Sequence, residues 1–259
     1  MSETASEQDL LTIAREAAAA AARILSAGQG AVHRVQAKSS PTDLVSETDV
    51  AAEQAIRGVL AERRPQDAIL GEEGGATGDG ALRWVIDPLD GTTNFLYGVP
   101  QYAVSVACED TDGAIAGVVL DPVRGEEFTA TRTGPAQLDG VDITGSDHDE
   151  LATALVATGF AYESEVRARQ AEVLTRVLPR VRDIRRAGAA ALDLAWCACG
   201  RYDAYWERGV KPWDVAAGGL IAARAGLALA PLAQAPGDPA GLLAAAPRLR
   251  DELLALVLG

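Results

Sequence analysis

Residues 84–95 constrain the fold of this chain more than any other segment, and they read Trp-Val-Ile-Asp-Pro-Leu-Asp-Gly-Thr-Thr-Asn-Phe. A short apolar run leads into two acids, Asp87 and Asp90, within a turn that Pro88 and Gly91 enforce. Apolar runs of this length between turn residues are typical of β-strands. Because hard divalent cations prefer oxygen ligands, a strand that ends in such a turn is suited to hold one. The segment therefore predicts a strand that delivers carboxylates to a cation site.

The composition is that of a globular chain, with 259 residues of which 48% are hydrophobic. This length suits one large domain or two closely packed lobes. The net charge is −14, and nucleic-acid phosphates and anionic membranes are bound through clustered Lys and Arg, so we expect neither partner. Bound metal ions would let so acidic a protein handle phosphates, although solubility alone also explains the charge.

The three cysteines, Cys108, Cys197 and Cys199, lack CxxC spacing. They favour a reducing compartment and buried, inert thiols over a zinc site. The first eight residues are polar and acidic, unlike a signal peptide, and no uncharged apolar run approaches the ~20 residues of a membrane helix. The sequence therefore predicts a cytoplasmic protein.

Helices and strands are expected to alternate in both halves of the chain. Helices are predicted at residues 7–27, 46–63, 163–178, 188–199, 213–226 and 248–258. Strands are predicted at residues 68–70, 83–86, 102–108, 114–120, 126–131, 154–158 and 202–207. Residues 36–43 are predicted as a polar loop, and the Ala- and Pro-rich residues 227–247 receive no element. We expect one unit with an N-terminal lobe, about 1–147, and a C-terminal lobe, about 148–259.

Acidic side chains stand at strand ends and helix starts in four places: Asp49, Glu72 with Glu73, Asp87 with Asp90, and Asp214. Each alone is a common turn or cap. Together they supply oxygen ligands without matching cations, since the chain has only two lysines, Lys38 and Lys211. Unpaired buried carboxylates are costly, so divalent metals are the expected compensation if the acids converge. Such a site suits metal-assisted hydrolysis of a phosphate ester, and no Ser-His or Cys-His pair indicates a covalent intermediate.

At these residues the chain resembles the inositol monophosphatase family of lithium-sensitive, magnesium-dependent phosphatases. Three segments carry the resemblance: Asp87-Pro-Leu-Asp-Gly-Thr-Thr-Asn-Phe95, Gly71-Glu-Glu73 upstream, and Trp213-Asp-Val-Ala-Ala-Gly218 downstream. The resemblance implies an α/β fold of the layered αβαβα sandwich type shared with fructose-1,6-bisphosphatase. It also implies two or three Mg²⁺ ions as cofactors and a homodimer.

The resemblance assigns roles to the matching positions. The metal ligands are Glu72, Asp87, the carbonyl of Leu89, Asp90 and Asp214. The catalytic residues are Asp49 and Thr92, which orient the attacking water, and Glu72, which reaches a third ion through water. The substrate-binding residues are Asp90, Gly91, Thr92, Gly188, Ala189, Ala190, Glu207 and Asp214, and Lys38 matches a loop lysine near the metals.

The implied reaction is hydrolysis of inositol-1-phosphate to myo-inositol and phosphate by a metal-activated water. Glu207 favours a polyol substrate because a carboxylate accepts hydrogen bonds from hydroxyls. Histidinol phosphate, fructose 1,6-bisphosphate and 3′-phosphorylated adenosine nucleotides stay open as substrates, and so does a non-catalytic binding protein. Two departures from the family pattern are Ala189, where a hydroxyl residue is common, and the absence of a polar Asp-Gly turn after Gly226.

Overall fold

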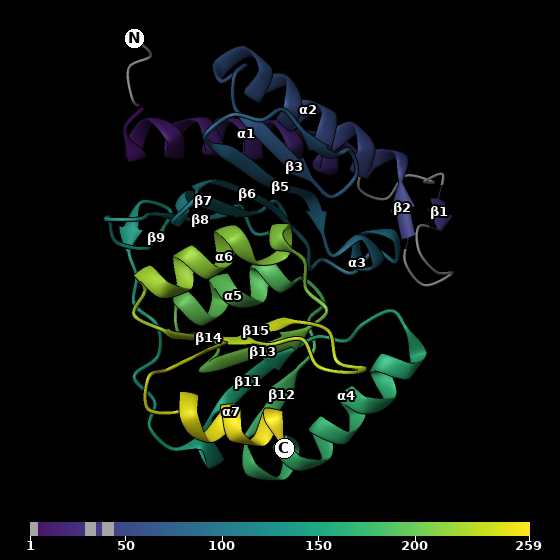
Figure 1. Cartoon of the computed structure of the whole chain (residues 1–259), viewed down its shortest axis with the longest axis vertical. Helices are drawn as coiled ribbons and strands as arrows, with labels where there is room; N and C mark the ends of the chain where they lie inside the picture. The colour runs from purple at the N-terminus through teal and green to yellow at the C-terminus, as the bar shows by residue number, and fades with distance from the viewer. Residues whose placement is uncertain (1–4, 29–34, 38–43) are drawn as a thin grey trace.

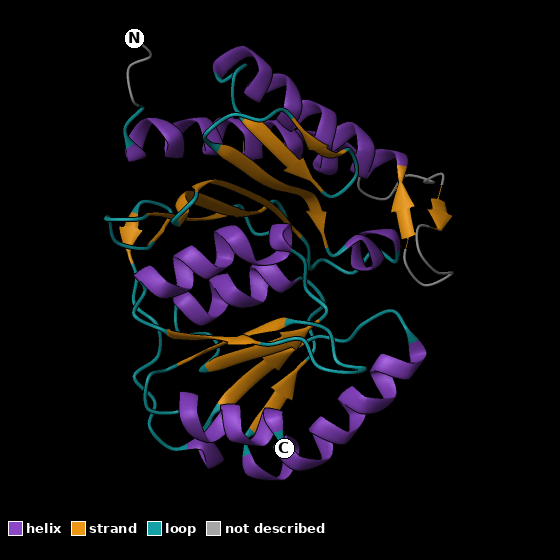
Figure 2. Ribbon diagram, viewed as in Figure 1, coloured by secondary structure: helices purple, strands orange, loops and turns teal. Residues whose placement is uncertain are grey.

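The computed structural model describes residues 5–28, 35–37 and 44–259, in which helices and sheets alternate in five layers (Figures 1 and 2). From the top of Figure 1 these are α1 with α2, an eight-stranded sheet, α5 with α6, a five-stranded sheet, and α4 with α7. This confirms the predicted α/β fold and its αβαβα layers.

The upper sheet is mixed, with strand order β10-β9-β8-β7-β6-β5-β3-β4. Its strands are β3 (Ala68–Gly71), β4 (Gly75–Thr77), β5 (Arg83–Asp90), β6 (Ala103–Asp110), β7 (Gly113–Asp121), β8 (Glu126–Thr131), β9 (Gln137–Leu138) and β10 (Val141–Asp142). The helices α1 (Glu7–Gly28) and α2 (Glu47–Arg63) cover one face, and the short α3 (Thr92–Leu96) follows β5. A separate ribbon pairs β1 (Val35–Ala37) with β2 (Leu44–Ser46).

The lower sheet has the order β12-β11-β13-β15-β14. Its strands are β11 (Leu155–Thr158), β12 (Asp183–Arg185), β13 (Ala204–Arg208), β14 (Ala228–Leu232) and β15 (Gly241–Ala245). The helices α5 (Ala190–Ala198) and α6 (Pro212–Arg224) separate the two sheets, while α4 (Ser164–Val177) and α7 (Arg250–Leu258) close the bottom. Short 3₁₀ turns stand at Leu151–Thr153 and Leu178–Arg180.

Each sheet is buried on both faces, and the strand sequences show why. On β6, Val104 and Val106 pack with α1 and α2, whereas Ala103 and Ala107 pack toward α5 and α6. Small residues on the inner face let the two middle helices approach the sheet closely. Cys108 and Cys197 are buried, and burial raises the pKa of the Cys108 thiol to about 12. Cys199 is only partly buried, so the expectation of three buried thiols was wrong for it.

The C-terminal segment, residues 227–247, forms β14 and β15, two strands that the sequence pattern did not indicate. Pro231 lies within β14, opposite Leu242. It is tolerated because β14 is the edge strand of its sheet, where a missing backbone donor breaks no ladder on the outer side. The loop between β14 and β15 contains Gly237 at φ +82°. It lacks the Asp-Gly turn that the family pattern leads us to expect after Gly226.

Other boundaries also differ from expectation. Residues 35–37 and 44–46 are paired strands, so part of the predicted loop at 36–43 is extended, and its remainder lies outside the described residues. The strand predicted at 83–86 continues to Asp90 through an irregularity between Asp87 and Asp90. The lobe boundary near residue 147 falls between β10 and β11 and stays a prediction. Among the described helices, none combines the length and apolarity needed to cross a membrane.

Candidate active site

Two pairs of parallel strands direct their carboxyl ends to the same place. In the upper sheet β3 pairs with β5, so Glu72 follows β3 beside the Asp87 and Asp90 end of β5. In the lower sheet β11 pairs with β13, which places Gly159 beside Glu207. Carboxyl ends of parallel strands are a common position for ligand sites in α/β folds. The acids that are distant in sequence therefore meet between the two sheets.

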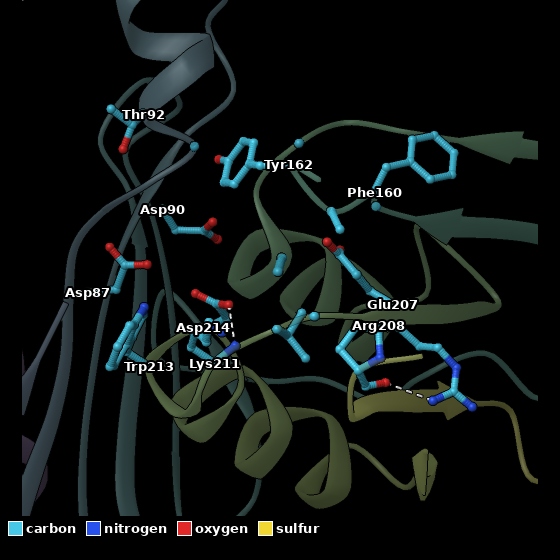
Figure 3. A pocket seen from close by; sticks show the side chains of 18 of the residues that line it. Asp87, Asp90, Thr92, Phe160, Tyr162, Glu207, Arg208, Lys211, Trp213 and Asp214 are labelled. Carbon is cyan, nitrogen blue, oxygen red and sulfur yellow. Dashed lines mark hydrogen bonds between the residues drawn. The ribbon is translucent and has the colours of Figure 1, made fainter. Parts of the chain in front are cut away.

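A cavity of about 600 Å³ opens at this point. Ten of the predicted site residues line it: Glu72, Asp87, Leu89, Asp90, Gly91, Thr92, Gly188, Ala190, Glu207 and Asp214. Figure 3 shows the carboxylates of Asp87, Asp90 and Asp214 turned toward a common space, with Glu207 on its far side. Asp49 and Ala189 are buried and do not line the cavity, and Lys38 lies outside the described residues.

Asp49 does not line the cavity itself, but it accepts a hydrogen bond from Thr92, which does. Ser46 caps α2 and accepts from the backbone of Asp49, whose carboxylate accepts in return from the backbone N–H of Ser46 at 3.0 Å. The second carboxylate oxygen accepts from the Thr92 hydroxyl at 2.9 Å. Since both residues are buried, this capping box fixes the Thr92 hydroxyl at the cavity edge.

The turn after β5 depends on Gly91 and Asn94. Gly91 has φ +98°, and a Cβ there would lie 3.0 Å from the Gln101 carbonyl oxygen. Asn94, the only asparagine in the chain, donates its amide to the carbonyls of Gln101 at 2.7 Å and Ala187 at 2.8 Å. Asn94 thus connects the turn after β5 to residues 187–189, which directly precede α5.

The Asp87 carboxylate is the most crowded of the acids. Burial raises its pKa well above the usual range, and Glu72, Asp90 and Asp214 raise it further by repulsion. Its Oδ1 accepts from the Leu89 N–H at 2.9 Å. Burial followed by repulsion from Asp90 also raises the pKa of Asp214, although the Lys211 N–H, which donates to Asp214 at 2.6 Å, opposes the shift (Figure 3).

Asp90 and Glu207 lie on opposite sides of the cavity, and the pKa values of both carboxyl groups are raised. Burial raises the pKa of each to about 7. The Ala191 N–H donates to Asp90 at 2.7 Å and the Tyr205 hydroxyl donates to Glu207 at 3.0 Å, and both bonds favour the ionised form. A Cβ on Gly159 would lie 2.0 Å from Glu207 Oε2, so a glycine after β11 is what leaves room for this carboxylate.

These acids fit a divalent cation by their chemistry. They supply only oxygen donors, and burial and mutual repulsion raise the pKa values of Asp87 and Asp214 despite the nearby Lys211. Across the described residues, no three His, Cys, Asp or Glu side chains lie close enough together to hold a metal ion as they stand. The ligand set therefore stays a prediction that rests on shared access to one cavity.

The far wall of the cavity was missed by sequence reasoning. Gly159, Phe160, Ala161, Tyr162, Glu163 and Val166 follow β11, and Arg186, Arg208, Gly209, Val210, Lys211, Trp213 and Pro239 complete the lining. Most of them lie after β11 or at and after the end of β13, and this position was the available signal, because both strands end at the cavity. Apart from Trp213, which opens the segment 213–218, these residues belong to no motif, so the sequence pattern alone did not single them out.

The layered fold and its acidic cavity place the chain in the class of proteins built as αβαβα sandwiches with an active site between the sheets. The model of the inositol monophosphatase family matches residues 6–257, and the chain belongs to that family. It is 47% identical over 241 residues to the inositol-1-monophosphatase SuhB of Mycobacterium tuberculosis, covering 88% of this chain and 81% of that protein.

Two further relatives extend the comparison. The crystal structure of extragenic suppressor protein suhB from Bartonella henselae superposes with a TM-score of 0.88 at 34% identity, covering 95% of this chain and 97% of that one. The Nus factor SuhB of Pseudomonas aeruginosa is 50% identical over 195 residues, covering 71% of this chain and 70% of that protein. The family and several relatives thus carry the names of phosphatases, whereas others are named as Nus factors.

Proposed function

We propose that this protein is a Mg²⁺-dependent phosphomonoesterase that hydrolyses inositol-1-phosphate to myo-inositol and phosphate. One observation carries the proposal: Glu72, Asp87, Asp90 and Asp214 line one cavity, with Glu207 across from them. Acids that repel one another in a cavity of about 600 Å³ suit divalent cations and a small phosphorylated substrate. The family membership supports the reaction class.

The proposed metal ligands are Glu72, Asp87, Asp90, Asp214 and the Leu89 carbonyl, for two or three ions. When bound, Mg²⁺ neutralises phosphoryl charge and lowers the pKa of water. The protein's own part is to hold these oxygens in fixed positions. Asp87 is fixed by the Leu89 N–H and Asp214 by the Lys211 N–H, so neither carboxylate has to be ordered during the reaction.

Thr92 is proposed to orient the attacking water. Its hydroxyl proton is committed to Asp49 at 2.9 Å, which leaves its oxygen able to accept a hydrogen bond from water. Asp49 keeps the hydroxyl in that orientation, and its carboxylate can stabilise positive charge that develops on the hydroxyl. Glu72, which lines the same cavity, is the proposed third member of this catalytic group.

The substrate is proposed to lie between the acids and Glu207. A polyol hydroxyl can donate to Glu207, while the backbone at Gly188 and Ala190 faces the ring. The amides of Gly91 and Thr92 are proposed to contact the phosphate. Ala189 is only 1% exposed and does not line the cavity, so its predicted contact with the substrate has no support from the geometry.

Phosphate release from inositol-1-phosphate by the purified protein with Mg²⁺ tests the proposal. We expect Asp87→Asn to reduce release to background while its circular dichroism stays that of the parent. Asp110→Asn is the matched control, because Asp110 ends β6 far along the sheet, where it pairs with Arg132 at 2.7 Å. Full turnover by Asp87→Asn would contradict the metal assignment.

A second candidate, a sugar bisphosphate such as fructose 1,6-bisphosphate, is favoured by Arg186. Its guanidinium lines the cavity 5.9 Å from the centre of the Phe160 ring and makes no ion pair within the described residues. A second phosphate on the substrate would supply that partner. Comparing kcat/KM for both substrates, histidinol phosphate and a 3′-phosphorylated adenosine nucleotide, in the parent and in Arg186→Gln, separates these possibilities.

The remaining proposals concern the cellular location, the oligomeric state and the partners of the protein. We propose a cytoplasmic homodimer without a nucleic-acid partner, since the net charge of −14 disfavours phosphate backbones. The Nus factor names belong to relatives, and titration of this protein with RNA at low salt tests that expectation here. Sedimentation velocity tests the dimer. A non-catalytic binding protein would be favoured if calorimetry showed that the protein binds no Mg²⁺.

A further inference from the structure

The loop that carries Glu72 is held by an acid on a neighbouring helix. Glu53 of α2 is 2% exposed, and its two carboxylate oxygens accept the backbone N–H groups of Glu73 and Gly74, each at 2.8 Å. These two N–H groups are the ones directly after Glu72. A charged acceptor that binds two successive amides fixes the path of the chain at that point.

Arg57, one turn further along α2, closes the arrangement. Its guanidinium donates to Glu53 at 2.7 Å, to the Gly75 carbonyl at 2.8 Å and to the Thr77 hydroxyl at 3.0 Å. The ion pair gives the buried Glu53 carboxylate a partner of opposite charge, and the other two bonds attach both ends of β4 to the helix. A buried carboxylate without such partners would be unfavourable.

The loop is built to close on this carboxylate. A Cβ on Gly71 would lie 2.6 Å from Glu53 Oε1, and a Cβ on Gly74 would lie 2.7 Å from the same oxygen. Glycine on both sides of Glu72 therefore permits contact with Glu53. Since α2 also carries Asp49 four residues earlier, one helix supports both Glu72 and the Asp49–Thr92 hydrogen bond.

We propose that Glu53, held by Arg57, is a positioning residue that sets where the Glu72 carboxylate stands beside Asp87. This inference rests on the proposed Mg²⁺-dependent function, because it gives Glu72 the role of a metal ligand. Glu53 is not among the residues that line the cavity. It acts by fixing two backbone amides, and its loss would leave Glu72 present but wrongly placed.

The test is Glu53→Gln, which keeps the size of the side chain and removes one acceptor and the charge. Partners that orient a metal-ligating carboxylate typically affect metal affinity about 10–100-fold. We expect Mg²⁺ binding, measured by calorimetry on the metal-stripped protein, to weaken by about that factor. We also expect kcat at saturating Mg²⁺ to recover toward the parent value, since the ligand itself remains.

Asp67→Asn is the matched control. Asp67 is an acid with a side-chain exposure of 6% that pairs with Arg64 at 2.7 Å and accepts from the Trp84 indole at 3.0 Å, in the same layers but away from the Glu72 loop. We expect it to lower stability without changing Mg²⁺ affinity. Equal weakening in both variants would show a general structural effect and overturn the proposal, as would parent-like Mg²⁺ affinity in Glu53→Gln.

Arg57→Lys serves if Glu53→Gln does not fold. A lysine keeps the charge beside Glu53 but cannot bind Glu53, Gly75 and Thr77 together, so Mg²⁺ affinity should fall several-fold, and an unchanged affinity overturns the proposal. A parent protein that binds no Mg²⁺ would overturn the proposed function and this inference with it. A parent that binds Mg²⁺ beside unaffected variants would overturn the inference alone.

Discussion

The Thr92 hydroxyl offers the sharpest test of how water is oriented. It donates to Asp49 at 2.9 Å, within reach of the Leu89 carbonyl at 3.2 Å, and both it and Asp49 are buried. Removing a group that positions a proton in the transition state typically costs 10²–10⁴-fold in rate. We expect Thr92→Val to lose about 100-fold or more in kcat for inositol-1-phosphate, with little change in KM.

Thr92→Ser is the control for that measurement, because it keeps the hydroxyl and removes only a methyl group. It should retain most of the activity. Comparable turnover in Thr92→Val and Thr92→Ser would remove Thr92 from the proposed catalytic group.

Asp193 on α5 gives a prediction about pH. It is 1% exposed, its Oδ1 has no hydrogen-bond partner among the described residues, and burial raises its pKa well above the usual range. The folded protein therefore keeps a proton that the unfolded chain releases at about pH 4, so this group lowers stability as pH rises above that value. Asp193→Asn removes the titration.

The expected result is that the unfolding free energy of Asp193→Asn, relative to the parent, increases between pH 5 and pH 8. Urea unfolding at several pH values measures it. A difference that does not change with pH would show that Asp193 titrates alike in the folded and unfolded states.

The N-terminus of α2 couples helix stability to the site. Ser46 caps this helix and binds Asp49, whereas Ser6 makes the same kind of cap for α1, through Asp9, on the exposed side. Loss of a serine cap costs about 1 kcal/mol. We expect Ser46→Ala and Ser6→Ala to lose similar stability in urea unfolding, with only Ser46→Ala lowering kcat. Equal kcat in the two variants would separate the cap from the catalytic group.

Sequence patterns predicted the helices and strands whose hydrophobic pattern is visible locally in the chain. The α1 face of Leu10, Ile13 and Ala17 and the apolar run of β5 are visible in any window of the sequence. In contrast, β14 contains Pro231 and pairs only at the sheet edge, so its identity depends on tertiary position rather than local pattern. The three-residue β12 is likewise defined by its parallel pairing with β11.

The residues of the candidate site also fall into two groups, those that a motif or the resemblance identified and those that only tertiary packing brings to the cavity. Asp87 and Asp90 were identifiable because a turn motif surrounds them, and Glu72 and Asp214 because the resemblance supplied their partners. Phe160 and Arg186 reach the cavity only through the packing of the second sheet, which no local pattern encodes. Glu53 was hidden for another reason, since an acid in a helix four residues before an arginine reads as a surface pair.

At the level of the whole molecule, the proposed metal site predicts that stability depends on divalent cations. Repulsion among Asp87, Asp90 and Asp214 opposes folding, and an ion that binds only the folded state offsets it. At 100 times its Kd such a ligand adds about 2.7 kcal/mol. We expect Mg²⁺ to raise the unfolding free energy by that order relative to EDTA, with Asp87→Asn losing most of the gain and Asp110→Asn keeping it.

The pH dependence of this effect provides an independent check. Burial and repulsion raise the pKa of Asp90 and of Glu207 to about 7, so protonation stabilises the metal-stripped protein and its stability falls as pH rises through that region. Bound Mg²⁺ removes much of the repulsion and should flatten the dependence. We therefore expect urea unfolding between pH 6 and pH 8 to show a steeper loss of stability in EDTA than in Mg²⁺. Parallel curves would indicate that the cation binds away from these acids.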